Sequence, residues 1–311
     1  MKKTISVVIP AYNEEKNLPL MRESLEKIFE KLSYEYEIIF VNDGSTDGSL
    51  DVLKKMARKD SRIKILDFSR NFGKEVAISA GCHAAGGDAI ITMDADLQHP
   101  PRLIKKFLAL WENGAEVVYT VRKENSGARM FKKISSRLFY WIFNKISDMK
   151  SESGTTDFRL MDRKVIEVFR TFPERERMFR GLIDWMGFHR VKVEFTASQR
   201  VNGSPAYSYS KLFRLAMNSF TSFSLFPLRV AGYLGVCISS VSGLVLFFML
   251  FSKLWDPGLF TPVAILAMSN VFLVGIVLIS LGLIALYIAR IHTEVSGRPL
   301  YIVREKINVK E

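Results

Sequence analysis

The chain has 311 residues, of which 44 are Lys or Arg and 32 are Asp or Glu, so its formal net charge is +12. With 48% hydrophobic and 24% charged residues, this composition excludes an intrinsically disordered chain. The charges avoid one region, because the stretch from Val230 to Ala289 contains only Lys253 and Asp256. We therefore expect part of the chain to lie in a membrane rather than in water.

Short buried strands alternate with amphipathic helices up to about residue 121. This alternation predicts an α/β domain with a mostly parallel, Rossmann-like sheet. The first apolar run ends at Pro10, so we expect a buried strand there and not a signal peptide. The predicted strands are Ile5–Ile9, Glu37–Val41, Ile63–Asp67, Ala89–Met93 and Glu116–Val121, and the predicted helices are Asn17–Leu32, Ser49–Lys59, Lys74–Ala85 and Pro101–Asn113.

Polar side chains gather where these strands end, which is where ligands bind in parallel α/β sheets. The glycine-rich loops of dinucleotide-binding proteins and P-loop NTPases are missing from the sequence. The segment Asn71–Glu75 has a Gly-Lys pair without the spacing or hydroxyl of a phosphate loop. The polar groups are Asn13, Glu14 and Glu15 after the first strand, Asp43, Ser45 and Asp47 after the second, and Asp94, Asp96 and Gln98 after the fourth.

The group after the fourth strand is a candidate metal site. Asp94, Asp96 and Gln98 have the same parity, so in an extended segment their side chains point to one side. Three oxygen ligands suit Mg²⁺ or Mn²⁺, whose remaining positions can be filled by a diphosphate and water. The alternative is a pair of solvated acids after a strand, and only the neighbouring acidic strand ends favour the metal.

Two segments before the uncharged region combine basic residues with apolar residues at helical spacing. They lie near residues 128–150 and 209–226, and we expect them to be helices at an anionic membrane surface, with packing on the soluble domain as the alternative.

Two membrane spans are predicted at about 230–252 and 262–289. The alternative is a buried helical hairpin in a soluble protein. Basic residues flank the pair of spans, which places both large flanks in the cytoplasm. The predicted organisation is a cytoplasmic domain at 1–226, a transmembrane hairpin at 227–290 and a cytoplasmic tail at 291–311.

Several strings in this order resemble a known family. Val8–Glu14, Val41–Asp47 and Asp94–Gln98 are similar to the glycosyltransferase-A fold of family 2 glycosyltransferases. Ser69–Glu75, Thr156–Arg159 and the C-terminal hairpin resemble the polyprenyl-phosphate glycosyltransferases, a group that contains dolichol-phosphate mannose synthase and bactoprenol glucosyltransferase. The resemblance covers almost the whole chain.

The resemblance implies inverting transfer of one sugar from a nucleotide diphosphate to polyprenyl (undecaprenyl) phosphate at a bacterial-type inner membrane. It favours UDP-glucose as donor, with a UDP-amino-sugar or GDP-mannose as alternatives, and it leaves room for a homo-oligomer. It implies that Asp96, with Asp94 and Gln98, holds Mg²⁺ or Mn²⁺, which stabilises the leaving diphosphate. The nucleotide sugar would contact Pro10, Tyr12, Glu14, Asp43, Asp94 and Ala95. Asp43 could instead cap the helix that begins near Asp47.

Arginines are our candidates for holding the acceptor phosphate, since a guanidinium fork matches phosphate oxygens. They are Arg122, just past the fifth predicted strand, and Arg200; a surface role is the alternative for each. Asp157 matches the family's catalytic carboxylate, and the sequence does not decide whether it acts as a base or orients a hydroxyl or an Arg. His99 precedes two prolines, so a turn-forming role competes with ligation.

One loop departs from the family pattern. After Gly203, Ala206 stands where family members often have Lys, which removes a positive charge, and Lys211 is our candidate to replace it. Rival interpretations are a processive polysaccharide synthase, a non-catalytic membrane scaffold or lipid-carrier binding protein, and a flippase. The synthase would need more membrane helices, and the flippase would need a water-lined passage, which two nearly uncharged spans cannot build in a monomer. The intact acids argue against the scaffold.

Overall fold

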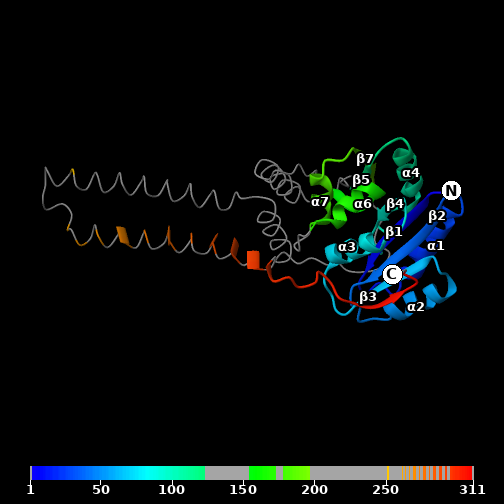
Figure 1. The fold of residues 1–311 in the computed structure, drawn as a ribbon, viewed down its shortest axis with the longest axis horizontal. Coiled ribbons are helices and arrows are strands. Elements are labelled where there is room, and N and C mark those ends of the chain that lie inside the picture. Colours follow the sequence, from blue (N-terminus) through cyan, green and yellow to red (C-terminus); the bar gives the residue numbers. More distant parts are fainter. Residues whose placement is uncertain are drawn as a thin grey trace. The chain divides into compact units, whose positions relative to one another are not determined.

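The structure is a computed structural model, and it describes residues 2–122, 154–172, 178–196 and 295–309, residue 251 and isolated positions between 261 and 292. The chain divides into two compact units, and every helix and strand named below belongs to the first (Figure 1). The first unit comprises Met1–Lys145, Met149–Ser208 and Arg298–Glu311, and the second comprises Ile146–Asp148 and Tyr209–Gly297.

The predicted membrane segments coincide largely with residues outside this described part. These are the spans at 230–252 and 262–289 and the amphipathic segments near 128–150 and 209–226. The described positions between 263 and 295 are helical. Among the helices whose residues the structure describes, none has the length and apolar character needed to cross a membrane.

The described strands form one sheet in the order β7-β5-β6-β4-β1-β2-β3-β8. The pairs β1–β2, β1–β4, β2–β3 and β5–β7 are parallel, and β6 and β8 pair antiparallel with their neighbours. The strands are β1 (Thr4–Ala11), β2 (Glu35–Asn42), β3 (Ile63–Phe68), β4 (Ala89–Thr92), β5 (Val117–Arg122), β6 (Thr155–Asp162), β7 (Arg190–Phe195) and β8 (Val303–Ile307).

Helices cover both faces of the sheet, which explains why the central strands are mostly apolar on both faces. Ile5, Val7 and Ile9 of β1 share a core with residues of α1, α2 and α4. Val8 faces the other side, where α3 crosses the strand and α6 and α7 pack beside α3 (Figure 1). The helices are α1 (Leu18–Phe29), α2 (Ser49–Lys59), α3 (Lys74–Ala84), the 3₁₀ turn η1 (Pro101–Leu103), α4 (Ile104–Glu112), α6 (Arg163–Arg170) and α7 (Phe179–Trp185).

The predicted α/β architecture with a mostly parallel sheet is confirmed. All five predicted strands and all four predicted helices are present, with ends that differ by a few residues. Three strands were not predicted, namely β6, β7 and β8. The segment 291–311, expected to be a tail, contributes β8 to the sheet edge.

Strand β6 enters the sheet antiparallel between β4 and β5. Thr92 pairs with Arg159 and Ile91 with Leu160, so the same register continued past β4 places Asp157 across from Asp94. The start of an antiparallel strand lies at the same edge as the ends of its parallel neighbours. The insertion therefore brings Asp157 to the edge where the polar residues after β1, β2 and β4 lie.

Strand β8 pairs with β3 and forms one end of the sheet, and β7 forms the other end. The Tyr301 ring stacks on Phe68 with centroids 5.1 Å apart, and the Arg304 guanidinium donates to the Ser69 carbonyl. Lys54 of α2 forms an ion pair of 2.6 Å with Glu305. This segment covers the backbone groups of β3 that would otherwise form an exposed edge.

Close packing of α3 on β1 depends on Gly81. A Cβ atom there would lie 2.2 Å from Val8 Cγ1, so Gly81→Ala has to displace α3 from the sheet. We expect it to lower the free energy of unfolding by about 1–3 kcal/mol, the usual cost of overpacking. The matched control is Gly86→Ala, whose Cβ would meet Glu37 Oε1 at an ordinary 3.6 Å. Thermal unfolding of both variants measures the effect, and equal melting temperatures would contradict this packing argument.

Candidate active site

The turns after β1 and β2 interlock at the carboxyl edge of the sheet. The Asn13 side chain accepts the backbone N–H of Thr46 at 2.8 Å, and the N–H of Glu14 donates to Ser49 Oγ at 2.9 Å. Asn13 has a φ of 58°, a left-handed conformation that Asn tolerates better than most residues. Among the predicted nucleotide-binding residues, Pro10 is the last but one residue of β1, Tyr12 is 47% exposed, and Glu14 accepts from the Asn17 amide at 2.6 Å.

Asp43 ties the end of β2 to the loop that precedes α3. Its buried carboxylate accepts the N–H groups of Phe72 at 2.7 Å and Gly73 at 3.0 Å. Burial raises the pKa of Asp43 although these bonds favour the charged form. Asp43 does not cap α2, whose N-cap residue is Gly48, and the residue that accepts the N–H of Ser49 at the start of this helix is Asp47, at 3.0 Å. Asp43 therefore shapes the entry to α3, and contact with a nucleotide stays a prediction.

The segment after β4 turns sharply. Asp96 Oδ1 accepts the N–H of Gln98 at 3.1 Å, and Leu97 has a φ of 60°. The segment turns from residue 95 onward and is not extended as far as Gln98, so the shared-face argument fails for Gln98, and a common face for Asp94 and Asp96 stays a prediction. Ala95 between them is buried. Ligation of a metal by Gln98 stays a prediction.

His99 supports this turn from inside. Its buried ring accepts the N–H of Asp94 at Nδ1, at 3.1 Å, and stacks on Phe158 with centroids 5.1 Å apart. Burial lowers the pKa of His99, so the neutral ring with its proton on Nε2 fits this contact. Nε2 lies 3.9 Å from Asp94 Oδ2, beyond hydrogen-bond distance. The geometry favours the turn-supporting role over ligation.

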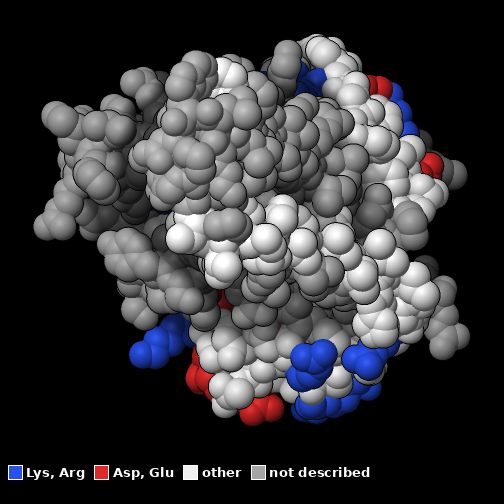
Figure 2. All heavy atoms as spheres, turned by 90° about the vertical axis from the view of Figure 1, so that its left-hand side faces the viewer, with Lys and Arg blue, Asp and Glu red and all other residues white. Residues whose placement is uncertain are grey.

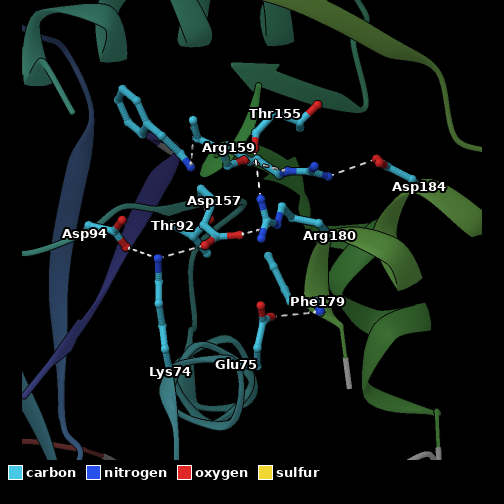
Figure 3. Close-up of polar contacts among 12 residues, drawn as sticks. Lys74, Glu75, Thr92, Asp94, Thr155, Asp157, Arg159, Phe179, Arg180 and Asp184 are labelled. Carbon is cyan, nitrogen blue, oxygen red and sulfur yellow. Dashed lines mark hydrogen bonds and ion pairs between the residues drawn. The ribbon is translucent and has the colours of Figure 1, made fainter. Parts of the chain in front are cut away.

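Lys74 joins two acidic residues at the centre of the site (Figure 3). Its ammonium lies 2.6 Å from Asp94 Oδ1 and 2.8 Å from Asp157 Oδ2. Lys74 is the first residue of α3, directly after Gly73, whose φ of 101° lets the chain turn there. Burial by itself would lower the pKa of Lys74, but the two carboxylates outweigh burial and raise it. The lysine is therefore a permanent cation that holds β4, α3 and β6 together.

Asp157 has a second cationic partner, Arg180 of α7. Arg180 Nε lies 3.1 Å from Asp157 Oδ1, and its Nη1 donates to the Thr155 carbonyl at 2.9 Å (Figure 3). Burial would raise the pKa of Asp157, but the charges of Lys74 and Arg180 hold it well below the usual range. Asp157 is therefore ionised at every physiological pH.

Helix α7 is anchored to the site by two further contacts. Glu75 Oε2 accepts the N–H of Phe179, the first residue of α7, at 2.9 Å. The fully buried Arg159 donates from Nη1 to Asp184 at 2.9 Å (Figure 3). Burial and the charge of Asp157 raise the pKa of Glu75 to about 7, although Arg180 opposes this. Contacts between α7 and the sheet thus position Arg180 beside Asp157.

The structure brings together only some of the predicted site residues. Asp94 and Asp157 meet through Lys74, and Asp96 lies two residues beyond Asp94. Arg122 is exposed at the end of β5, where its N–H donates to the Gly154 carbonyl at 2.9 Å. Arg200 and Lys211 lie outside the described residues.

Sequence reasoning missed the contributions of Lys74, Glu75 and Arg180. The sequence could have pointed to Lys74 and Glu75, because Asn71–Glu75 lies within a segment that resembles the polyprenyl-phosphate glycosyltransferases and leads into a predicted helix. Arg180 gives no sequence signal, since its partner lies 23 positions earlier in an unpredicted strand.

The donor set fits a divalent cation such as Mg²⁺ or Mn²⁺. Asp94 and Asp96 offer carboxylate oxygens, the hard ligands that these cations prefer. Within the part of the chain that the structure describes, no cluster of three or more His, Cys, Asp or Glu residues surrounds a metal position. A cation here would accordingly need ligands from a bound diphosphate and water, which is the usual arrangement for Mg²⁺ with phosphate substrates.

The comparisons with known proteins agree with this architecture. Residues 6–169 match the model of glycosyl transferase family 2. The chain is 40% identical over 305 residues to the uncharacterized glycosyltransferase YkcC of Bacillus subtilis, with 98% of this chain and 94% of that protein covered. It is 38% identical over 301 residues to a bactoprenol glucosyl transferase of Shigella phage SfII, with 97% of each covered.

Among solved structures, mannosyl-3-phosphoglycerate synthase from Rubrobacter xylanophilus resembles this chain in fold. The TM-score is 0.52 at 17% sequence identity, and the match covers 70% of this chain and 71% of that one.

The burial of Glu75 predicts a pH-dependent stability. A pKa raised to about 7 means that the folded protein binds more protons than the unfolded one above pH 4.5. The stability from the protonated carboxyl is complete below pH 4.5 and is lost as pH rises through about 7. Relative to Glu75→Gln, which cannot ionise, the wild type should lose melting temperature between about pH 5 and 8. The exposed Glu23→Gln is the control, and parallel curves for wild type and Glu75→Gln would contradict the assignment.

Proposed function

Since the chain belongs to glycosyl transferase family 2, we propose that it moves a single sugar from a nucleotide diphosphate donor to the phosphate of a polyprenol. The protein is a glycosyltransferase, and the proposal concerns its donor, acceptor and mechanism. The observation that supports a polyprenyl phosphate as the acceptor is the similarity to a bactoprenol glucosyl transferase over 97% of both chains. Undecaprenyl phosphate is the proposed acceptor and UDP-glucose the proposed donor.

The donor's diphosphate is proposed to bind at the carboxyl edge of the sheet. Asp94 and Asp96 would hold the divalent cation with Gln98, and the bound cation would offset the negative charge that the leaving diphosphate gains. Tyr12, exposed just past β1, offers its ring to the nucleotide base. Pro10, Glu14, Asp43 and Ala95 are the other proposed donor contacts.

The acceptor is a phosphate monoester, which already carries negative charge at neutral pH. One of its oxygens attacks the anomeric carbon as the bond to the diphosphate breaks, with inversion and release of the nucleoside diphosphate. This nucleophile needs positioning more than deprotonation. We propose that three basic residues position the acceptor phosphate, namely Arg122, Arg200 and Lys211. The last two lie outside the described residues.

Asp157 is proposed to act as a fixed anion and not as a general base. An effective base has a pKa near the working pH, whereas Lys74 and Arg180 hold the pKa of Asp157 far below that value. Its carboxylate instead orients these two cations toward the edge where the diphosphate and acceptor phosphate would meet.

A membrane location follows from the proposed acceptor, because polyprenols are lipids. We propose that the segments 230–252 and 262–289 form a hairpin in a bacterial-type inner membrane, with both flanks in the cytoplasm and the segments near 128–150 and 209–226 at its surface. A homo-oligomer would give the two spans a partner to pack against.

Incubation of the purified full chain with a short-chain polyprenyl phosphate, Mg²⁺ or Mn²⁺ and single nucleotide sugars tests the proposal. A glycolipid of the expected mass, released by mild acid, supports it, and the donor that yields it identifies the sugar. Product with UDP-amino-sugars or GDP-mannose alone would overturn the UDP-glucose assignment. No product with any donor would favour a non-catalytic lipid-carrier binding protein.

Loss of one metal-holding carboxylate should remove most of the activity. Asp96→Asn is expected to lower kcat/KM by about 100-fold or more, similar to the loss of one charge-stabilising group in other enzymes. Asp51→Asn, an exposed substitution of the same chemistry on α2, is the matched control and should keep wild-type rates. An undiminished rate for Asp96→Asn would remove the metal assignment.

The proposed role of Asp157 predicts how rate depends on pH. The rise in rate near pH 6 should follow the second ionisation of the acceptor phosphate, which occurs at about that pH. Asp157→Asn should therefore be slower but keep the same dependence. Rates measured from pH 5 to 8 check this, and a profile that becomes flat in the variant would show that Asp157 is a base after all.

A further inference from the structure

Lys74 forms an ion pair with one carboxylate oxygen of Asp94, which is a proposed metal ligand. Its ammonium lies 2.6 Å from Asp94 Oδ1, and the same ammonium is held at 2.8 Å by Asp157 (Figure 3). The side chain of Asp157 is 7% exposed, whereas those of Asp94 and Lys74 are 26% and 37% exposed. The Asp94 side chain is thus the more exposed of the two acidic partners, although the oxygen that contacts Lys74, Oδ1, is itself buried.

The local charges nearly cancel without any metal. Asp94 and Asp157 contribute two negative charges, and Lys74 and Arg180 contribute two positive charges that contact them. Asp96 adds one further negative charge nearby. A divalent cation approaching alone would meet little net attraction, and it would lie close to the ammonium on Asp94.

A nucleotide diphosphate changes this balance because it brings negative oxygens of its own. Those oxygens can ligate the cation and can also accept hydrogen bonds from the lysine ammonium, a strongly hydrated point charge on a flexible stem. Lys74 could then leave Asp94 for the diphosphate while Asp157 keeps it in place. Arg180 differs from Lys74 in this respect, because among the described ion pairs it contacts Asp157 and not Asp94.

We propose that Lys74 is a positioning residue that acts as the counter-ion of Asp94 before substrate binds, and so makes tight binding of the divalent cation depend on the nucleotide diphosphate. The inference rests on the proposed function, because it takes Asp94 as a metal ligand. It assigns to Lys74 two successive partners, the Asp94 carboxylate and then the diphosphate. A lysine with a purely structural role would leave metal affinity unchanged.

The test measures metal binding directly. The full chain in detergent is freed of metal with a chelator, and free Mn²⁺ is then counted by electron paramagnetic resonance, without nucleotide and with UDP or GDP. The variants are Lys74→Met and Lys74→Gln, which remove the charge, and Lys74→Arg, which keeps it. Arg180→Met is the matched control, because it removes a positive charge from Asp157 but not from Asp94. Lys74→Gln keeps a donor between the carboxylates should Lys74→Met fail to fold.

Without nucleotide, Lys74→Met and Lys74→Gln should bind Mn²⁺ at least about tenfold more tightly than the wild type, since one repelling charge next to the metal position is gone. Lys74→Arg and Arg180→Met should stay near the wild type. With nucleotide present, the neutral variants should no longer bind Mn²⁺ more tightly than the wild type, because they lack the ammonium that would contact the diphosphate.

If the wild type binds Mn²⁺ in a nucleotide-dependent way, two results would overturn the inference about Lys74 and leave the proposed function standing. One is unchanged or weaker Mn²⁺ binding by both neutral Lys74 variants. The other is an equal gain in Arg180→Met, which would show a general effect of net charge. A failure of the proposed function looks different, because then no protein binds Mn²⁺ even with UDP or GDP.

Discussion

One ammonium group placed between two carboxylates organises the functional edge of this protein. Lys74 contacts Asp94 after β4 and Asp157 on β6, and thereby fixes the start of α3 against two strands. Removing the ammonium would leave the Asp94 carboxylate without this partner and the buried Asp157 with Arg180, which costs more than losing a surface ion pair. The remaining contacts extend from this bridge, through Arg180 to α7 and through His99 to the turn after Asp94.

The same bridge restricts the chemistry available to Asp157. A carboxylate in contact with two cations is too weak a base to accept a proton, but it fixes the positions of those cations. That is suited to a nucleophile that arrives already ionised, as a phosphate does, and it is unsuited to activating an alcohol. Glu75, one residue from Lys74, has the opposite environment, because burial raises its pKa to about 7. Two carboxyl groups in one site are thus driven to different charge states by their neighbours.

Sequence patterns predicted those parts of the fold that depend on local periodicity. Five strands and four helices could be located because apolar runs and helical stripes alternate along the first 121 residues. Strand β6 escaped because its pairing between β4 and β5 depends on distant residues, and Val303–Ile307 alternates too weakly to stand out at a sheet edge. For the site, Asp94, Asp96 and Asp157 could be chosen by position and resemblance. The partners that set their charge state could not, because Lys74 and Arg180 meet Asp157 only after β6 is in place.

Strand β8 gives the domain an unusual assembly order. Arg304 and Ser69, which bond across the last strand pair, are 235 positions apart in the chain. Everything between them, including the whole second unit, has to leave the ribosome before the sheet receives its final strand. Closing so long a loop is slow compared with forming the neighbouring β1–β2 pair. A nascent chain therefore carries an incomplete sheet with β3 as an open edge for most of its synthesis, and during that time β3 can pair with the wrong strand.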